Sequence, residues 1–377
     1  MKNKNVAVFI RTTNIYDDSR ATKEIYSLVD AGFKVIVLGW GRREDASLKC
    51  AEAFKDVKNE VSFSFYSVLL PTGIGMRNID KLFGWFQWVK RKVKCMDQIS
   101  LIHACNLDGG ICVYRFCKRN RIPFIYDIYD YYVDAHHIPN IAKTIVEKME
   151  INVINNANTT IICTEERRVQ IGKATPKKIE VIYNSPDIDN LNDVEIKSDY
   201  AYCGSLCEKR LIKEILDEYI NNTDLVINFA GNDSYYEYVK KISNDYANFN
   251  FLGTLPYSEV LKIESEARVI SAIYEPSIRN HKLCAPNKFY EALALGKPII
   301  VCRGTGLDKI VENEKIGIVI AYDAKQFYTA LRTLLSDKSM CEKMGLRARK
   351  IYEEKYRWSL MKKRLEKIYN EFIKREE

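Results

Sequence analysis

Short apolar segments alternate with helix-length amphipathic segments along this chain, and the alternation occurs twice. In the first half, an apolar segment at 6–10 precedes a helical pattern, Gly32 and a second apolar segment at 35–38. Strands joined through helices run parallel, and parallel sheets bury both faces. The pattern therefore predicts an α/β fold with two doubly wound sheets. The other predicted strands lie at 100–104, 123–127, 159–163, 179–182, 200–203, 225–230, 249–252, 269–273, 299–301 and 317–320.

A polar, turn-rich stretch from 184 to 199 separates the two series of strands. We expect a first domain at 1–185 and a second at 197–357, because 377 residues exceed what one hydrophobic core usually organises. The last segment, 358–377, carries apolar residues at helical spacing among many charges. It is expected to form a long helix that packs back across the first domain.

The composition is that of an ordinary globular protein, with 47% apolar and 29% charged residues. No stretch approaches the roughly 18 apolar residues that a membrane-spanning helix needs. The 11 cysteines lack paired Cys-x-x-Cys spacing, and the first residues run into an apolar segment without an export signal. We therefore expect reduced thiols and a cytoplasmic protein.

The stretch 285–301 carries the most informative motif. It predicts a helix that begins near Pro286, ends at Gly296 and leads into a buried strand. Lys288 and Glu291 stand three residues apart in the opening turns, so they share a face near the positive end of the helix dipole. Free amides and a lysine suit a diphosphate, and a carboxylate one turn later suits the hydroxyls of a ribose. The alternative interpretation is an exposed ion pair on an ordinary helix.

This stretch resembles the donor-site helix of glycosyltransferase family 4, whose members are retaining enzymes with the GT-B fold. In that family an apolar helix ending in Gly-x-Pro follows a glutamate that binds the donor ribose, and the resemblance gives Glu291 that role. It also places Pro286, Asn287 and Lys288 at the donor diphosphate.

Other segments resemble the same family in order and spacing. The segment 202–206, followed by Arg210, is similar to the first loop of the C-terminal domain, where a glycine approaches the phosphates and a basic residue pairs with them. The resemblance thus assigns Gly204, Ser205 and Arg210 to the donor. Leu252 would lie beside the nucleotide base. The segment 17–20 resembles the start of the N-terminal domain in the bacterial surface-polysaccharide branch, and we expect Asp18 and Arg20 on the acceptor side.

Two positions depart from the family pattern. Leu283 stands where many members have a glutamate, so the catalytic role of that glutamate has no counterpart here. Tyr129 stands where many members have a sugar-contacting histidine, between Asp127 and Asp130. Because open sheets place ligands at the carboxyl ends of their strands, we expect Asp127, Tyr129 and Asp130 to take part in catalysis. A capping and loop role is the alternative interpretation.

The segment 76–94 carries aromatic residues beside a basic cluster. Residues 1–190 hold 28 lysines and arginines against 22 aspartates and glutamates, so most of the net charge of +8 lies in this half. Such a segment is typical of a membrane-surface element, here at the inner leaflet, although a core helix with one solvated face has the same pattern. In the first case the acceptor would be a lipid-linked saccharide.

Taken with the resemblance, these patterns predict a GT-B fold, in which two Rossmann-like domains face a cleft and the C-terminal helix crosses back to the first domain. The predicted activity is metal-independent transfer of a hexosyl group (EC 2.4) from a nucleotide-sugar, with a UDP-sugar favoured, to a saccharide or lipid-linked acceptor. Arg210 and Lys288 would stabilise the departing diphosphate. We expect no metal and no nucleic-acid partner. The alternatives are a non-catalytic nucleotide-sugar-binding subunit and a nucleotide-sugar epimerase, whereas a nicotinamide-dependent enzyme would need a Gly-x-Gly-x-x-Gly motif after a strand.

Overall fold

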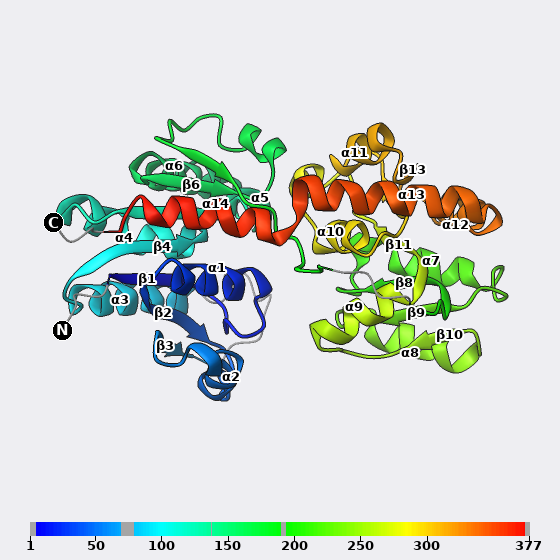
Figure 1. Ribbon diagram of the computed structural model, residues 1–377, viewed down its shortest axis with the longest axis horizontal. Helices are drawn as coiled ribbons and strands as arrows, with labels where there is room; N and C mark the ends of the chain where they lie inside the picture. Colours follow the sequence, from blue (N-terminus) through cyan, green and yellow to red (C-terminus); the bar gives the residue numbers. More distant parts are fainter. Residues whose placement is uncertain (1–4, 69–78, 137, 190–193, 374–377) are drawn as a thin grey trace. The chain divides into compact units, whose positions relative to one another are not determined.

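The computed structural model describes residues 5–68, 79–136, 138–189 and 194–373 (Figure 1). The chain divides into two compact units, one formed by 1–183 with 361–377 and the other by 184–360. Helix α14 (Trp358–Asn370) carries the chain from the second unit back to the first, because the residues from Met361 onward belong with the first unit. The predicted return of the C-terminal helix is confirmed.

The described residues of the first unit form a seven-stranded parallel sheet in the order β3-β2-β1-β4-β5-β6-β7. Its strands are β1 (Val6–Arg11), β2 (Lys34–Gly41), β3 (Val61–Ser67), β4 (Ile99–Cys105), β5 (Phe124–Ile128), β6 (Thr159–Ile162) and β7 (Ile179–Val181). Every residue of β4 and β5 is buried, as expected for parallel strands covered on both faces. The sequence patterns missed β3, an edge strand in which Val61, Phe63 and Phe65 alternate with polar residues.

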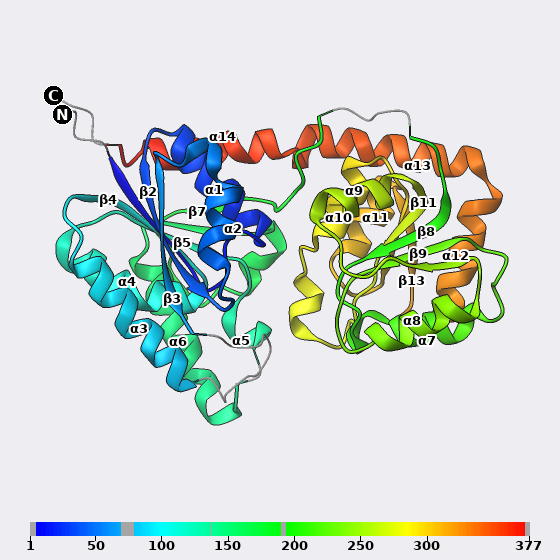
Figure 2. The ribbon, with the colours of Figure 1, turned by 90° about the horizontal axis from the view of Figure 1, so that it is seen from below.

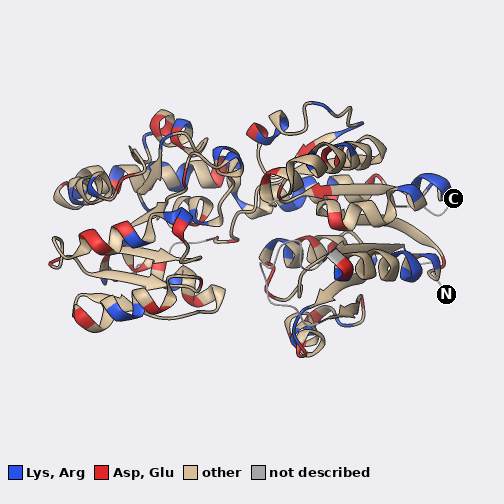
Figure 3. Cartoon of the chain, turned by 180° about the vertical axis from the view of Figure 1, so that it is seen from behind, with Lys and Arg blue, Asp and Glu red and all other residues tan. Residues whose placement is uncertain are grey.

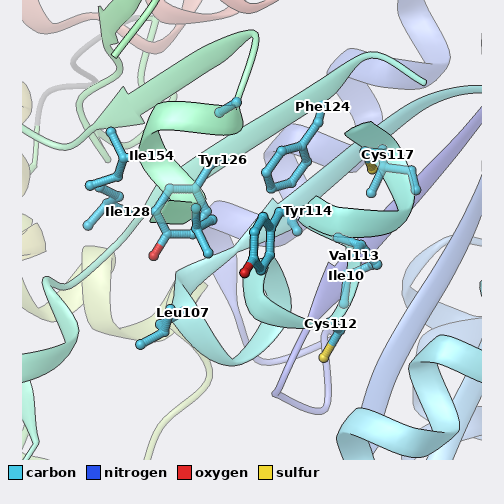
Figure 4. Close-up of a cluster of buried hydrophobic side chains, with 14 of the residues drawn as sticks. Ile10, Leu107, Cys112, Val113, Tyr114, Cys117, Phe124, Tyr126, Ile128 and Ile154 are labelled. Carbon is cyan, nitrogen blue, oxygen red and sulfur yellow. The ribbon is translucent and has the colours of Figure 1, made fainter. Parts of the chain in front are cut away.

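Helices cover both faces of this sheet. Figure 2 shows α3, α4 and α6 on one face and α1 with α14 on the other. The helices of the unit are α1 (Ser19–Asp30), α2 (Ala46–Ala53), α3 (Ile79–Lys94), α4 (Asn106–Asn120), α5 (Tyr132–Ala135) and α6 (Asn140–Asn156). Figure 4 shows part of the core between the sheet and these helices, where Phe124 and Tyr126 of β5 lie near Tyr114 of α4.

The described residues of the second unit form a six-stranded parallel sheet in the order β10-β9-β8-β11-β12-β13. Its strands are β8 (Ser198–Cys203), β9 (Ile227–Ala230), β10 (Phe249–Phe251), β11 (Ala267–Ala272), β12 (Ile299–Cys302) and β13 (Gly317–Ile320). Its helices are α7 (Ile212–Tyr219), α8 (Tyr236–Asp245), α9 (Tyr257–Ser265), α10 (Asn287–Ala294), α11 (Leu307–Glu314), α12 (Ala324–Ser336) and α13 (Lys338–Ile351).

The strand order reverses once in each sheet, between β1 and β4 in the first unit and between β8 and β11 in the second. Loops leave such neighbouring strands in opposite directions, and open α/β sheets bind ligands in the crevice at that point. In the second unit the loop after β8 and the long connection from β11 to α10 leave the carboxyl ends of these two strands. These are the segments that carry most of the predicted donor-binding residues.

No helix among the described residues has both the length and the apolar character needed to span a bilayer. Figure 3 shows lysines and arginines interspersed with aspartates and glutamates over both units.

Candidate functional site

The ammonium group of Lys288 lies against the loop that follows β8. A β-carbon built on Gly204 would stand 2.0 Å from Lys288 Nζ, which is far inside van der Waals contact. The same Nζ lies 4.4 Å from the centroid of the Tyr202 ring. The missing side chain at Gly204 therefore lets the cation reach the loop, and the structure brings these two predicted donor residues together.

Arg210 is held in place by an aromatic ring and a histidine. Its guanidinium carbon lies 3.7 Å from the centroid of the Tyr274 ring, and its Nη1 lies 3.1 Å from His281 Nε2. The other ring nitrogen, Nδ1, lies 3.0 Å from the Glu275 carbonyl oxygen, which only accepts, so Nδ1 carries the hydrogen. Burial and the neighbouring Arg210 charge lower the pKa of His281. A neutral His281 therefore accepts a hydrogen bond from Arg210 and fixes the guanidinium.

The amino end of α10 begins directly after Pro286. The φ and ψ angles of Pro286 are −72° and 139°, and no side chain caps the helix at that residue. The first amides of a helix lack partners within the helix, and they carry the positive end of its dipole. The Asn287 side-chain oxygen accepts a hydrogen bond of 2.8 Å from Asn184 Nδ2. The predicted helix start is thus present, and Lys288 lies in its first turn.

Glu291 is buried, so the alternative interpretation as an exposed surface pair is wrong. Only 3% of its surface is exposed. Its carboxyl group hydrogen bonds with the hydroxyl of Tyr257 and faces the carboxyl group of Glu264, which is fully buried in α9. Burial, together with the nearby Glu291 charge, raises the pKa of Glu264 well above its ordinary value. Two facing carboxyl groups therefore lie close to the Lys288 cation.

The loops after β8, β9 and β10 pack backbone to backbone. A β-carbon on Gly231 would stand 1.8 Å from the Gly204 carbonyl oxygen, and the Gly231 amide donates to the Gly253 carbonyl at 2.8 Å. Ser205 is exposed, and its hydroxyl donates to the Asp233 carboxylate at 2.5 Å. Leu252, at the end of β10, is 38% exposed. The glycines bring these strand ends close together and leave Ser205 and Leu252 at the surface of the unit.

In the first unit, Asp127 and Arg20 form a buried ion pair. Arg20 Nη2 lies 2.9 Å and 3.0 Å from the two Asp127 oxygens, and Arg20 Nε lies 2.8 Å from Glu24 Oε1. Burial alone would raise the pKa of Asp127, but the Arg20 charge and the neighbouring His103 and Glu24 side chains lower it to about 2. Both members of the pair are buried and bond to each other, which does not favour the predicted catalytic role of Asp127 or the predicted acceptor-side role of Arg20.

Tyr129 also belongs to the buried network. Its hydroxyl donates to Glu24 Oε2 at 2.7 Å, and its ring lies between the guanidinium groups of Arg11 and Arg20, 4.1 Å and 4.6 Å from the ring centroid. The hydroxyl of Tyr129, a residue predicted to take part in catalysis, is therefore used in a hydrogen bond within the domain. Sequence reasoning missed Glu24, although its spacing of four residues from Arg20 on α1 is a signal of side-chain pairing.

Asp130 and Asp18 have different surroundings. The Asp130 side chain is about half exposed and lies 3.1 Å from Arg167 Nη2. It is therefore the acidic residue of the 127–130 segment that solvent reaches. Asp18 caps α1, because its side chain accepts from the Ala21 amide at 3.1 Å, and it also accepts from Arg11 Nε at 2.8 Å. The helix that follows the 127–130 segment is α5, and no side chain caps it at its first residues, so the capping role considered for Asp127 and Asp130 is not seen there.

His103 connects this network to the C-terminal helix. Its Nδ1 lies 3.1 Å from the Tyr369 hydroxyl, and Lys362 pairs with Asp30 of α1 at 2.7 Å. Among the described residues, Glu24, His103 and Cys105 each have a potential ligand atom within 4.8 Å of the others. The Arg20 guanidinium already supplies a positive charge at Glu24. The network therefore consists of ion pairs and hydrogen bonds that anchor α14 to the sheet.

The described part of the segment 76–94 is α3, and 76–78 lie outside the described residues. Trp85 and Val89 are fully buried, and the Trp85 indole donates to the Asp108 carbonyl at 2.9 Å. Phe83 is 63% exposed, and it shares the outward face with Lys90 and with further cations at helical spacing. One face of α3 therefore packs into the core, and a basic face with one aromatic residue remains on the surface.

The parallel strand order, the two units and the returning helix define a GT-B fold, and solved structures agree with this. Sucrose-phosphate synthase from Thermosynechococcus elongatus superposes with a TM-score of 0.73 at 13% identity, covering 98% of this chain and 99% of that chain. Anabaena HepE in complex with UDP superposes with a TM-score of 0.66 at 13% identity, covering 97% and 100%. The predicted fold class is confirmed.

Two sequence comparisons add to the structural likeness. Residues 201–337, just over a third of the chain, match the family model described as Glycosyl transferases group 1. A stretch of 92 residues is 35% identical to the capsular polysaccharide biosynthesis glycosyltransferase CapM of Staphylococcus aureus, and it covers 24% of this chain and 24% of that protein. The chain thus spans about a quarter of the curated relative it matches. The family-model match lies within the unit that holds Gly204, Arg210 and Lys288.

Proposed function

We propose that this protein is a glycosyltransferase of the family 4 type that moves a sugar from a nucleotide-sugar to an acceptor in the synthesis of a surface polysaccharide. The second unit binds the donor and the first unit binds the acceptor. The family-model match and the CapM similarity support the glycosyl-transfer activity, and the CapM name supports the polysaccharide product.

One observation carries the proposal. At the point where the strand order of the second sheet reverses, Lys288 lies against the loop at Gly204, beside the amino end of α10. Arg210, on the segment that follows the same loop, is held by Tyr274 and His281. Two cations and a helix amino end are what a pyrophosphate needs, and they stabilise negative charge as the glycosidic bond breaks. Glu291 supplies a carboxylate for the ribose hydroxyls.

We favour a UDP-sugar as the donor and retention of configuration at the transferred carbon. The likeness to HepE in its complex with UDP supports the choice of base, and the resemblance of 285–301 to the family 4 donor helix supports retention. Thermal-shift measurements with UDP, GDP, ADP and CMP test the donor, because a ligand that binds only the folded state raises its apparent stability. A shift with UDP is expected, whereas no shift with any of the four would contradict the proposal.

A second candidate function is a non-catalytic subunit that binds a nucleotide-sugar beside an active partner. Leu283 in place of a glutamate and the inward Tyr129 hydroxyl favour it, because both remove groups that act on the sugar in many family members. Hydrolysis of a UDP-sugar by the purified protein separates the two functions. Measurable release of free sugar supports the enzyme, whereas binding without turnover supports the subunit. Interconversion of free donor sugars without an acceptor would instead indicate an epimerase.

We further propose that α3 contacts the inner leaflet of the membrane, where a lipid-linked saccharide would be the acceptor. Phe83 and Lys90 stand seven residues apart on the same exposed face, and Arg91 follows on it. Co-sedimentation with phosphatidylglycerol vesicles tests the contact. The pair Lys90→Glu with Arg91→Glu should reduce binding, while the exposed pair Lys240→Glu with Lys241→Glu, in α8 of the second unit, should not. Equal vesicle binding by the unmodified protein and both double variants would contradict the proposed membrane contact.

A further inference from the structure

Helices α9 and α10 bring two carboxyl groups together behind the Lys288 cation. Tyr257 and Glu264 stand seven residues apart on α9, which is two turns along one face, and both interact with Glu291 of α10. Lys288 stands three residues before Glu291 on the same helix. The Glu264 side chain has no exposed surface. The four side chains therefore form one cluster at the edge of the proposed donor site, in which the two carboxyl groups are buried, Lys288 is half-buried and Tyr257 is exposed.

Burial and the nearby Glu291 charge outweigh the Lys288 charge, which favours the ionised form of Glu264. Neither of its oxygens accepts a hydrogen bond from an N–H or O–H group of the described residues. An ionised carboxylate in that position would be fully buried next to a second carboxylate, and the Lys288 charge would offset that cost only in part. By contrast, Glu291 receives the Tyr257 hydroxyl. A single proton shared by the two carboxyl groups therefore belongs on Glu264, and it points at Glu291.

We infer that Glu264 is a positioning residue, whose protonated carboxyl group donates a hydrogen bond to Glu291 and so holds the Glu291 carboxylate in the orientation in which it binds the donor ribose. This inference rests on the proposed function, because it gives Glu291 its ribose contact. It assigns to Glu264 a role that the sequence motifs do not indicate. Glu264 touches neither the sugar nor the diphosphate.

The arrangement makes donor affinity depend on pH. The titratable groups that face Glu264 are Glu291 and Lys288 of α10, Cys203 of β8 and Tyr257 of its own helix. Burial and the Glu291 charge raise the pKa of Glu264. As the pH rises through that value the proton is lost, the two carboxylates repel each other, and Glu291 leaves its position. The KM for the donor should therefore rise once the pH exceeds the Glu264 pKa, while kcat stays constant.

Two substitutions of Glu264 separate positioning from packing. Glu264→Gln keeps the side-chain volume and an N–H group that does not ionise. Affinity for the nucleotide-sugar should therefore stay near that of the unmodified protein, and it should no longer fall as the pH rises. Glu264→Leu removes the donor, and UDP affinity should fall about tenfold or more at every pH. The matched control is Glu259→Gln, an exposed carboxyl on the same helix, which should change neither quantity.

Calorimetric titration with UDP and with 2′,3′-dideoxy-UDP tests the inference, with thermal melting as the check on folding. The Glu264→Leu loss should appear with UDP and vanish with the dideoxy analogue, which lacks the hydroxyls that Glu291 would bind. An equal loss of affinity with both ligands would overturn the inference but not the proposed function. The same holds if Glu264→Gln bound UDP as weakly as Glu264→Leu. If the unmodified protein bound neither UDP, GDP, ADP nor CMP, the proposed function and this inference would fall together.

Discussion

Lys288 Nζ occupies the space that a side chain at Gly204 would fill, 2.0 Å from the position of its β-carbon. The atom that must move is the end of a flexible side chain, so Gly204→Ala should displace the cation, and the φ of 158° at Gly204 adds some backbone strain to the substituted protein. We expect the KM for the donor to rise about tenfold or more, the scale of a lost hydrogen bond to a charged group. Steady-state kinetics and a melting curve measure both effects.

A double-mutant cycle shows whether that loss acts through the lysine. Adding Gly204→Ala to Lys288→Ala should cost little more than Lys288→Ala alone, because the displaced group is already missing. Gly172→Ala is the matched control, since its nearest neighbour would be 3.5 Å away at an exposed site. Fully additive losses would show that Gly204 acts independently of Lys288.

Asp127 should matter for stability. Asp127→Asn leaves the buried Arg20 guanidinium without its carboxylate and should destabilise the protein by about 3–5 kcal/mol. Glu24→Gln should cost only about 1 kcal/mol, because burial and the Asp127 charge raise the pKa of Glu24, so that it is already uncharged. Denaturant unfolding of both variants provides the comparison. Equal losses of stability in the two variants would contradict a charged Asp127 beside an uncharged Glu24.

The same ion pair predicts an acid limb in the stability. The pKa of Asp127 is lowered to about 2 in the folded protein, against about 3.9 in an unfolded chain. The stability that Asp127 contributes is therefore complete above about pH 4 and is lost as the pH falls towards 2. This part of the pH dependence should be missing in Asp127→Asn. Denaturation midpoints measured between about pH 4 and pH 2 test whether stability falls as the pH falls.

Tyr129→Phe tests whether the tyrosine replaces the sugar-contacting histidine. Because its hydroxyl donates to Glu24 within the domain, the substitution should reduce the free energy of unfolding by about 1 kcal/mol and leave kcat and KM unchanged. Chemical unfolding and transfer kinetics on the same sample measure the two effects. A large loss of kcat with unchanged stability would restore a direct role on the sugar.

Metal independence is open to a simple test. Arg210, Lys288 and the α10 amino end supply the positive charge that a divalent cation would otherwise bring to the diphosphate. Transfer should therefore continue at an unchanged rate after treatment with EDTA. A loss of activity that Mg²⁺ or Mn²⁺ restores would show that a metal completes the site.

Much of the fold could be predicted from sequence because its signals are local. Buried parallel strands such as β4 and β12 are continuous apolar runs, and the glycines at 204 and 296 mark the ends of a strand and a helix. Strand β3 was missed because it lies at the sheet edge, where one face is polar. Its alternation of Phe63 and Phe65 with serines is a weaker pattern.

The candidate site was only partly predictable, for a related reason. Lys288 and Glu291 stand on one helix, so their spacing alone places them together. Glu264 and His281 reach the site only through tertiary packing, and a buried carboxyl within α9 has the same sequence signature as an exposed one. Similarly, the strand-end position of Asp127 indicated a ligand site, whereas its pairing with Arg20, 107 residues away, decided its role.

The most direct test is the affinity of the protein for UDP when the two proposed diphosphate ligands are removed. Lys288→Ala and Arg210→Ala should each lower transfer by roughly 100-fold or more, the usual scale for one charge-stabilising contact, and should weaken UDP binding. Lys209→Ala, the exposed neighbour of Arg210, should behave like the unmodified protein. Near-normal transfer and UDP binding in either site variant would contradict the assignment of the donor site to this end of the second sheet.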